Sequence, residues 1–317
     1  MTERVAAPER DAWVISAGKA GHDVQSLGLA ETLGLVPRIL TVAPRGLHRL
    51  LAPWGPPQPH PEFRPPWPGI AIASSRQTIP YARALRRRSG GRSFTIVLQS
   101  PGISPRHFDL VWVPEHDRLR GENVVTTLTA PHRMTRERLD EAAAAWRPRL
   151  AHLPAPRIVV LVGGTSGAYR FGPDEGEALG RDLARLARET GGSLLVTASR
   201  RTGAESMARL SAAISDQPAF VWTSGPENPL FGFVALADAF VVTCDSANML
   251  GEAAFTGKPL YAYNLPGGSA KFARFHAGMV AHGAMRWFDG GLDRWSYPPL
   301  DANQIVADAV RARLAQR

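Results

Sequence analysis

The residues best suited to chemistry lie in one segment, Val241 to Pro259, which predicts a buried strand, a polar turn, a helix and a glycine stop. The turn places Asp245, Ser246 and Asn248 where the helix begins. Unbonded backbone N–H groups and the positive end of the helix dipole meet there, so the position favours an anion. One helical turn further along, the carboxylate of Glu252 can accept hydrogen bonds from two sugar hydroxyls. This combination is typical of an α/β protein that binds a nucleotide.

A purely structural interpretation of the same residues stays open. Asp and Ser are the usual N-caps of any helix. Glu252 could be a first-turn acid that interacts favourably with the positive end of the helix dipole. A second loop tips the balance toward function. Gly163, Gly164 and Gly167 follow another predicted strand, and successive glycine N–H groups can cradle a phosphate. A plain tight turn is the alternative for these glycines.

This glycine loop matches neither common nucleotide motif. It is not G-x-G-x-x-G, and the Gly-Lys-Ser/Thr ending of a P-loop is missing. The strand that follows ends in Arg200 and Arg201 instead of an acid, which suits phosphate and disfavours ordinary NAD binding. Exposure at a strand end is the alternative for both arginines.

The composition is that of a folded protein of two domains. The chain has 317 residues, 44% of them hydrophobic and 21% charged. The single cysteine, Cys244, allows no disulfide framework and fits a reducing compartment. The first 16 residues do not resemble a signal peptide, and no stretch is apolar enough to span a bilayer. We therefore expect a cytoplasmic protein that is soluble or peripheral on the inner face of the cytoplasmic membrane.

The net charge of +9 attracts anions such as nucleotides, phospholipid surfaces and nucleic acid. The densest basic run is Arg83 to Arg92, for which a solvated helix face and a contact with anionic lipid headgroups are both open. Neither an aromatic RNA-binding signature nor a zinc-finger or other metal-ligand spacing is present. We expect no nucleic acid partner, no metal and no cofactor.

Strands alternate with helices in both halves, which predicts parallel sheets covered by helices. Residues 147–156 contain three prolines and are the best linker candidate. The predicted architecture is α/β, with two Rossmann-like domains facing a cleft: residues 1–150, residues 157–300 and a C-terminal helix at 301–317. Residues 44–68 are interpreted as an irregular surface excursion.

The loop after the first predicted strand is the best place for a general base. His22 is the preferred base because imidazole titrates near neutral pH. Asp23 could orient His22, act as the base or cap the helix. His116 with Asp117 is a second acid/base candidate on the same rim, with ordinary turn chemistry as the alternative. We expect the acceptor side to include Gly18, Lys19, Gly21 and Gln25.

Residues 238–259 resemble the donor-binding segment of GT-B glycosyltransferases of the MurG type. There a strand, a polar turn, a helix with a ribose-binding Glu and Gly-x-Pro recur, and Glu252 has the matching spacing to Gly257. The resemblance implies that Glu252 binds ribose hydroxyls. It also implies that Ser246, Ala247 and Asn248 meet the diphosphate, with the base against the loop after Phe220 to Thr223.

A second resemblance rests on six pieces spread along the chain: Gly18 to Ala30, Pro114 to Asp117, Gly163 to Ser166, Thr197 to Thr202, Asn228-Pro229 and Asp245 to Glu252. Through them nearly the whole chain resembles the mitochondrial-fission "elongated mitochondria" family, whose plant member is associated with recruiting a dynamin-like GTPase. This chain departs from the GT-B pattern, because its N-terminal loop holds Lys19 and His22 instead of a purely glycine-rich run.

Three hypotheses follow. The first is a metal-independent GT-B glycosyltransferase that uses a nucleotide-diphosphate sugar and a lipid-linked or cell-envelope acceptor. The second is a non-catalytic recruitment protein on a membrane surface that keeps this fold, and the third is a nucleotide-sugar epimerase. The donor residues predicted for the first are Gly163, Gly164, Thr165, Ser166, Arg200, Arg201, Asn228, Asp245, Ser246, Ala247, Asn248, Glu252 and Lys271.

Overall fold

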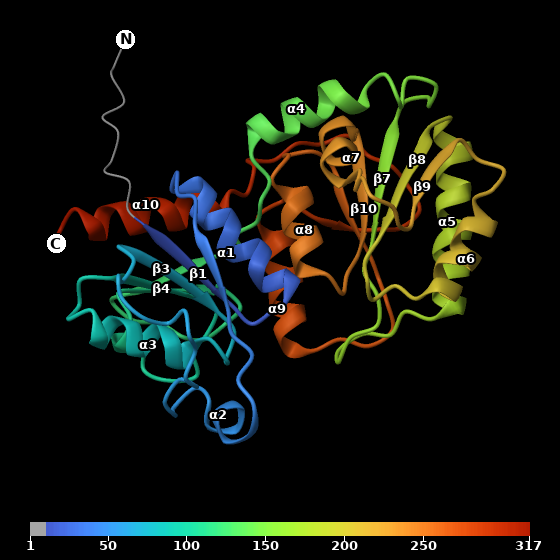
Figure 1. Ribbon diagram of the computed structural model, residues 1–317. Helices are drawn as coiled ribbons and strands as arrows, with labels where there is room; N and C mark the ends of the chain where they lie inside the picture. Colours follow the sequence, from blue (N-terminus) through green and yellow to red (C-terminus); the bar gives the residue numbers. More distant parts are fainter. Residues whose placement is uncertain (1–10) are drawn as a thin grey trace, which may run out of the picture. The chain divides into compact units, whose positions relative to one another are not determined.

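The computed structural model describes residues 11–317, which form two compact units (Figure 1). One comprises the chain up to Arg133 together with Asp301–Arg317, and the other comprises Met134–Leu300. Within the described residues each unit is built on a six-stranded sheet, and every strand pairing is parallel. The N-terminal segment that was expected not to be a signal peptide lies mostly outside the described residues.

The sheet of the first unit has the strand order β2-β1-β3-β4-β5-β6. Its central strands are continuous runs of buried residues, as expected for a parallel sheet covered on both faces. The strands are β1 (Ala12–Ser16), β2 (Arg38–Thr41), β3 (Ile70–Ser74), β4 (Phe94–Leu98), β5 (Leu110–Pro114) and β6 (Val124–Thr127).

Alternate residues of these strands enter two separate cores. Trp13 and Ile15 pack with residues of α3 (Ile79–Arg88), whereas Val14 packs with α1 (Ala20–Thr32) and α10 (Ala302–Leu314). Figure 1 shows α3 and α10 on opposite faces of this sheet. Helix α2 (Gly46–Leu51) and a 3-10 turn, Pro105–His107, lie in the connections.

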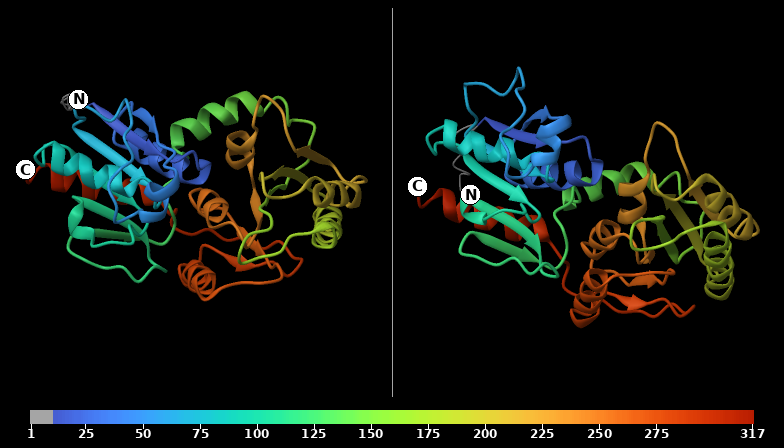
Figure 2. Two further views of the ribbon diagram at one scale, coloured as in Figure 1. Left: turned by 60° about the horizontal axis from the view of Figure 1, so that its bottom comes forward. Right: turned by 90° about the horizontal axis from the view of Figure 1, so that it is seen from below.

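The sheet of the second unit has the order β12-β11-β10-β7-β8-β9. Figures 1 and 2 show α5 and α6 on one face and α8 and α9 on the other. The strands are β7 (Arg157–Val162), β8 (Ser193–Ala198), β9 (Ala219–Trp222), β10 (Ala239–Thr243), β11 (Leu260–Tyr263) and β12 (Arg286–Trp287). The helices are α4 (Arg136–Trp146), α5 (Pro173–Thr190), α6 (Ala204–Ala213), α7 (Leu230–Leu236), α8 (Ala247–Ala254) and α9 (Ala270–Ala281).

The units divide at residue 134, which differs from the expected boundary at 150. Helix α4 belongs with the second unit because Trp146 packs edge-on against Phe220 and Phe233. A Cβ at Gly232 would lie 2.3 Å from the Trp146 ring, so this contact needs a glycine. Helix α10 returns to the first unit, where Val306 and Val310 are fully buried. The excursion at residues 44–68 contains helix α2, which the sequence analysis missed.

Each sheet has one point where the direction of strand winding reverses. It lies between β1 and β3 in the first unit and between β7 and β10 in the second. Open α/β sheets bind ligands outside the carboxyl ends of the strands at such a point. Across residues 11–317, none of the helices combines the length and apolarity needed to cross a membrane.

Candidate functional site

The loops after β7 and β10 are joined by one buried carboxylate, that of Asp245. Its Oδ1 accepts the Thr243 hydroxyl at 2.7 Å, and its Oδ2 accepts the Gly164 N–H at 3.0 Å. The guanidinium of Arg201 donates to the same Oδ2 at 2.8 Å. The Thr243 hydroxyl in turn accepts the Gly163 N–H at 2.7 Å. A hydrogen-bonded network therefore holds the loops after β7 and β10 together at the winding reversal of the second sheet.

Gly163 and Gly164 have a different role from the phosphate cradle that was predicted. A Cβ at Gly163 would lie 2.2 Å from Asp245 Oδ1, and one at Gly164 would lie 2.1 Å from the Arg201 carbonyl oxygen. Glycine is required because the two loops touch. Both N–H groups donate to Thr243 and Asp245, so neither is available to a phosphate.

The next two predicted donor residues also hold their own loop. The Thr165 hydroxyl bonds with the main chain of Phe171, and the Ser166 hydroxyl accepts the N–H groups of Ala168 and Tyr169. These contacts shape the loop after β7 without using a ligand.

The prediction that Asp245 contacts the donor needs correction, because its side chain is fully buried. The Arg201 guanidinium donates to Asp245 and to the carbonyls of Gly164 and Thr165 but stays 42% exposed, so its contact with the donor remains a prediction. Arg200 differs, because its guanidinium is exposed and has no hydrogen-bond or ion-pair partner among residues 11–317. It lines a pocket of about 520 Å³ at the carboxyl ends of β8 and β9, which Thr223 also lines.

Glu252 is a carboxylic acid of the second unit whose pKa is strongly raised. It lies on α8, whose N-cap Ser246 accepts the Met249 N–H and whose first residues are Ala247 and Asn248. Glu252 is half-buried as a residue, and its carboxylate has no hydrogen-bond or ion-pair partner within the described residues. Burial among the surrounding atoms raises its pKa to about 7. A desolvated carboxylate without a donor is the condition that a hydroxyl-bearing ligand would relieve.

The two remaining predicted donor residues lie on other helices of the second unit. Lys271 is exposed in the first turn of α9, after the carboxyl end of β11. The Asn228 side chain accepts the Leu230 N–H at 3.0 Å, so it helps to begin α7. A structural role thus accounts for Asn228.

Sequence reasoning missed His276, which is buried on α9. Its Nε2 lies 2.9 Å from the Cys244 carbonyl oxygen and so holds the chain just after β10. Burial lowers its pKa, which keeps the ring neutral. His276 and Tyr169 line a pocket of about 580 Å³ beside the turn Gly267-Gly268-Ser269. The glycine turn directly before α9 was the feature of the sequence that could have pointed to this pocket.

In the first unit, the loop after β1 meets the ends of β3 and β4. The Ser74 hydroxyl donates to the His22 carbonyl at 3.3 Å, and the Gln99 amide donates to the Gln25 side chain at 3.0 Å. Asp23 accepts the Ser16 hydroxyl at 2.6 Å, and that hydroxyl accepts the Gly18 N–H. Asp23 therefore fastens the loop, in which Lys19 is the helix N-cap and Gly21 is exposed.

The His22 ring fits a base that is neutral at physiological pH. Its Nδ1 is buried without a hydrogen-bond partner in the described part of the chain. Burial lowers its pKa, and the neighbouring Lys19 charge lowers it further, against the opposite effect of Asp23. Neutral imidazole is the form that accepts a proton.

Backbone strain gathers at the same place. Ser75, after β3, has a φ of 97°, and Gln99, after β4, has a φ of 75°, a region that favours glycine. The Ser75 hydroxyl is buried and has no hydrogen-bond partner among residues 11–317. Strained residues of this kind cluster at functional sites.

His116 lies apart from this cluster. It follows β5, which β3 and β4 separate from β1, so three strand spacings put it about 14 Å along the sheet from the His22 loop. Asp117 sits in a turn closed by its own N–H to the Pro114 carbonyl, and its carboxylate accepts the Arg118 N–H. Turn chemistry accounts for these contacts of Asp117.

Residues 20–314 match the family described as Mitochondrial fission ELM1. The chain belongs to this family. The mitochondrial fission protein ELM1 of Arabidopsis thaliana is 32% identical over 277 residues, an alignment that covers 79% of this chain and 65% of the plant protein. The chain thus spans just under two thirds of that relative's length.

Solved structures show the fold of this ELM1-family chain. Os79 of O. sativa, crystallised with UDP, has a TM-score of 0.53 and 12% identity, covering 96% of this chain and 91% of its own. A putative UDP-N-acetylglucosamine 2-epimerase of Listeria monocytogenes has a TM-score of 0.51 and 8% identity, covering 96% and 88%. The predicted α/β, GT-B-like class of two Rossmann-like domains is confirmed.

Proposed function

We propose that this chain is a glycosyltransferase that binds a nucleoside-diphosphate sugar on its second unit. It transfers the sugar, without a metal, to a hydroxyl of a lipid-linked or cell-envelope acceptor at the inner face of the cytoplasmic membrane. The single observation that supports the donor site is Glu252, a desolvated carboxylate without a partner in the described residues, on a helix that begins at a winding reversal.

In this proposal the ribose hydroxyls donate to Glu252, and the diphosphate meets the amino end of α8 beside Ser246. Arg200 follows β8 and Lys271 follows β11, on either side of β10 and β7, and these exposed cations would neutralise the leaving diphosphate. His22 would accept the proton of the attacking hydroxyl. The crystals of Os79 hold UDP, which supports a nucleotide as the donor here.

The decisive experiment is a thermal-shift assay with a panel of UDP-, GDP-, ADP- and CMP-sugars. We expect one nucleotide to raise the melting temperature of the wild type and not that of Glu252→Ala, because ligand binding stabilises only a competent folded state. The control is Glu189→Ala, which removes an exposed carboxylate from α5 and should respond as the wild type does. The absence of any shift with every nucleotide would contradict the proposal.

Two other functions predict different outcomes of the same work. An epimerase, favoured by the likeness to the Listeria structure, would bind the nucleotide sugar and invert its sugar without an acceptor. A recruitment protein, favoured by the name of the plant relative, would bind partners and show no nucleotide shift. Analysis of the sugar after incubation, with and without acceptor, separates transfer from inversion.

A further inference from the structure

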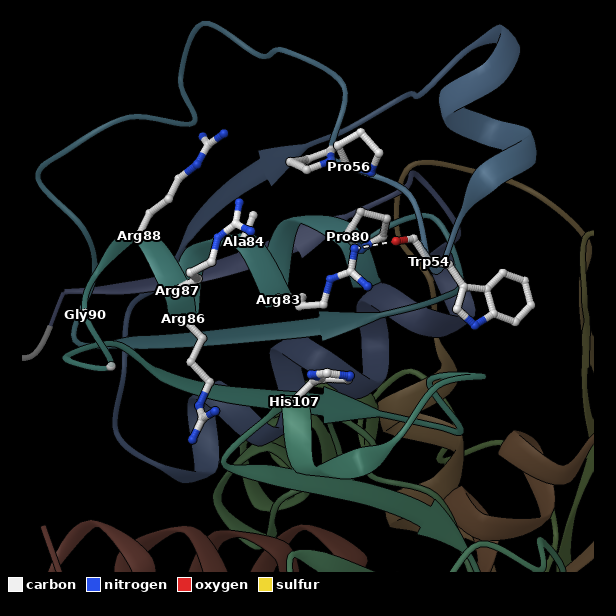
Figure 3. A pocket seen from close by; sticks show the side chains of 12 residues that line it. Trp54, Pro56, Pro80, Arg83, Ala84, Arg86, Arg87, Arg88, Gly90 and His107 are labelled. Atoms are coloured by element: carbon white, nitrogen blue, oxygen red, sulfur yellow. Dashed lines mark hydrogen bonds between the residues drawn. The ribbon is translucent and has the colours of Figure 1, made fainter.

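The first unit carries an arginine-lined groove of about 880 Å³ on the outer side of α3. The arginine groove is formed by Arg83, Arg86, Arg87 and Arg88 on one side and by Trp54 and His107 on the others. Figure 3 shows Arg83 reaching the carbonyl of Trp54, while Arg87 and Arg88 extend from the same helix in other directions.

The positive charge of the groove is poorly compensated. Residues 39–108 contain one acidic residue, Glu62, against ten arginines: Arg45, Arg49, Arg64, Arg76, Arg83, Arg86, Arg87, Arg88, Arg92 and Arg106. Glu62 pairs with Arg38, outside that stretch. Asp109 pairs with Arg86 and with Arg317. Arg87 has no ion-pair partner among residues 11–317, and Arg83 donates to neutral carbonyls, which leaves its charge in place.

An apolar ridge adjoins the groove. Leu47, Leu50, Leu51 and Trp54 are 71%, 74%, 51% and 66% exposed, and helix α2 buries none of its residues. Arginines hold the ridge in place: Arg76 donates to the Leu50 carbonyl and Arg83 to that of Trp54. Trp54 belongs to both features, so the apolar ridge and the arginine groove form one continuous surface.

We propose that this surface docks on an anionic phospholipid bilayer, with the apolar ridge in the headgroup and acyl boundary and the arginine groove on lipid phosphates. Charge complementarity supports this occupant, because one guanidinium group can donate two parallel hydrogen bonds to the oxygens of a phosphate. The exposed leucines and tryptophan support it as well, because Leu and Trp side chains beside cations are typical of surfaces that insert at the membrane interface. A nucleic acid would use the arginines and leave the leucines in water.

Docking of this kind is independent of sugar transfer, since the surface shares no residue with the proposed donor site. It would nevertheless hold the first unit at the surface where a lipid-linked acceptor lies. The sequence alone pointed to the basic run Arg83 to Arg92. The structure adds the apolar partner, helix α2 and Trp54, which comes from a segment interpreted as irregular.

The test is co-sedimentation of the full chain with vesicles of phosphatidylcholine alone or with about 30% phosphatidylglycerol. We expect binding only to the anionic vesicles, weakened at high salt. The double variant Arg87→Gln/Arg88→Gln should bind about 25-fold more weakly, since each arginine near such a surface is worth about 1 kcal/mol, or about five-fold. Leu47→Ser/Leu50→Ser should lose at least about ten-fold, because insertion contributes through buried apolar area.

The matched control is Arg147→Gln/Arg294→Gln, which removes the same charge from exposed sites of the second unit and should bind almost as the wild type does. All substituted side chains are exposed, so unchanged melting temperatures should show that each variant folds. Three results would overturn the proposal. They are equal losses in the control, no loss in the leucine variant, and displacement from vesicles by inorganic phosphate or duplex DNA at equal phosphate concentration.

Discussion

Both units have a parallel sheet with one winding reversal, but the polar groups beside the two reversals differ. In the second unit, Asp245 closes the loops after β7 and β10 with a hydroxyl, an amide and a guanidinium, and one carboxylate, Glu252, is left over. In the first unit, Ser75 and Gln99 are strained, and buried atoms of His22 and Ser75 lack partners within the described residues.

The second unit therefore has a site whose polar groups are already paired, whereas the first unit has one with strained residues and unpaired polar groups. Bonded loops keep their geometry without a ligand, so the second unit should bind with little reorganisation. Strain and unpaired polar groups raise the free energy of the empty first unit, and a ligand that donates to them would recover part of it. Four predictions test the contrast, in order of decreasing effect.

The largest effect is expected for His22→Gln. If the first unit supplies the base, transfer should fall by about 10²–10⁴-fold while the thermal shift with donor stays unchanged. The control is His152→Gln, an exposed histidine of the second unit.

In addition, Lys19→Gln should raise the His22 pKa and move the acid limb of the pH–rate profile to higher pH. An unshifted limb would exclude His22 as the titrating base.

Asp245→Ala should lower the free energy of unfolding by about 3–5 kcal/mol, measured by urea denaturation. Removing the carboxylate leaves the buried Gly164 N–H and Thr243 hydroxyl without their partner and breaks the ion pair of the half-exposed Arg201. Asp140→Ala removes an exposed carboxylate from α4 and should change stability by less than about 0.5 kcal/mol. Similar values for the two variants would mean that the network does not lock the loops.

Glu252→Gln should stabilise the ligand-free protein in a pH-dependent way. The folded pKa of about 7 exceeds the ordinary value of 4.5, so the wild type loses stability as pH rises between these values. The variant should therefore be more stable than the wild type by up to about 3 kcal/mol at pH 8 and by almost nothing at pH 4. Denaturation at both pH values measures this, and a constant difference would mean that Glu252 is not desolvated.

The smallest effect is expected for Ser75→Gly. Glycine adopts a φ of 97° without strain, so the variant should be more stable by about 1 kcal/mol. It should also bind acceptor less well if the Ser75 hydroxyl is a ligand group. The comparison is Ser215→Gly, an exposed position without positive φ, where no stabilisation is expected. Equal effects would indicate that the strain of Ser75 is not stored at the site.

The sequence by itself determined what depends on neighbours along the chain. Apolar runs predicted the strands of both sheets except the exposed β12, and helical periodicity predicted the buried face of α5, which includes Leu179 and Leu183. Cap chemistry located the start of α8 at Ser246, and spacing put Glu252 on that helix. These features are local, so a correct pattern is enough to predict them.

Only the tertiary structure decided which polar groups are already occupied. Gly164 and Asp245 are 81 residues apart and meet because β10 lies beside β7 in the sheet. That network makes Asp245 a structural residue and ties Arg201 to it, whereas Arg200 and Glu252 have no hydrogen-bond or ion-pair partner among residues 11–317. The exposure of α2 could not be predicted from the sequence either. A short apolar helix is buried or exposed depending on whether an element distant in sequence packs on it.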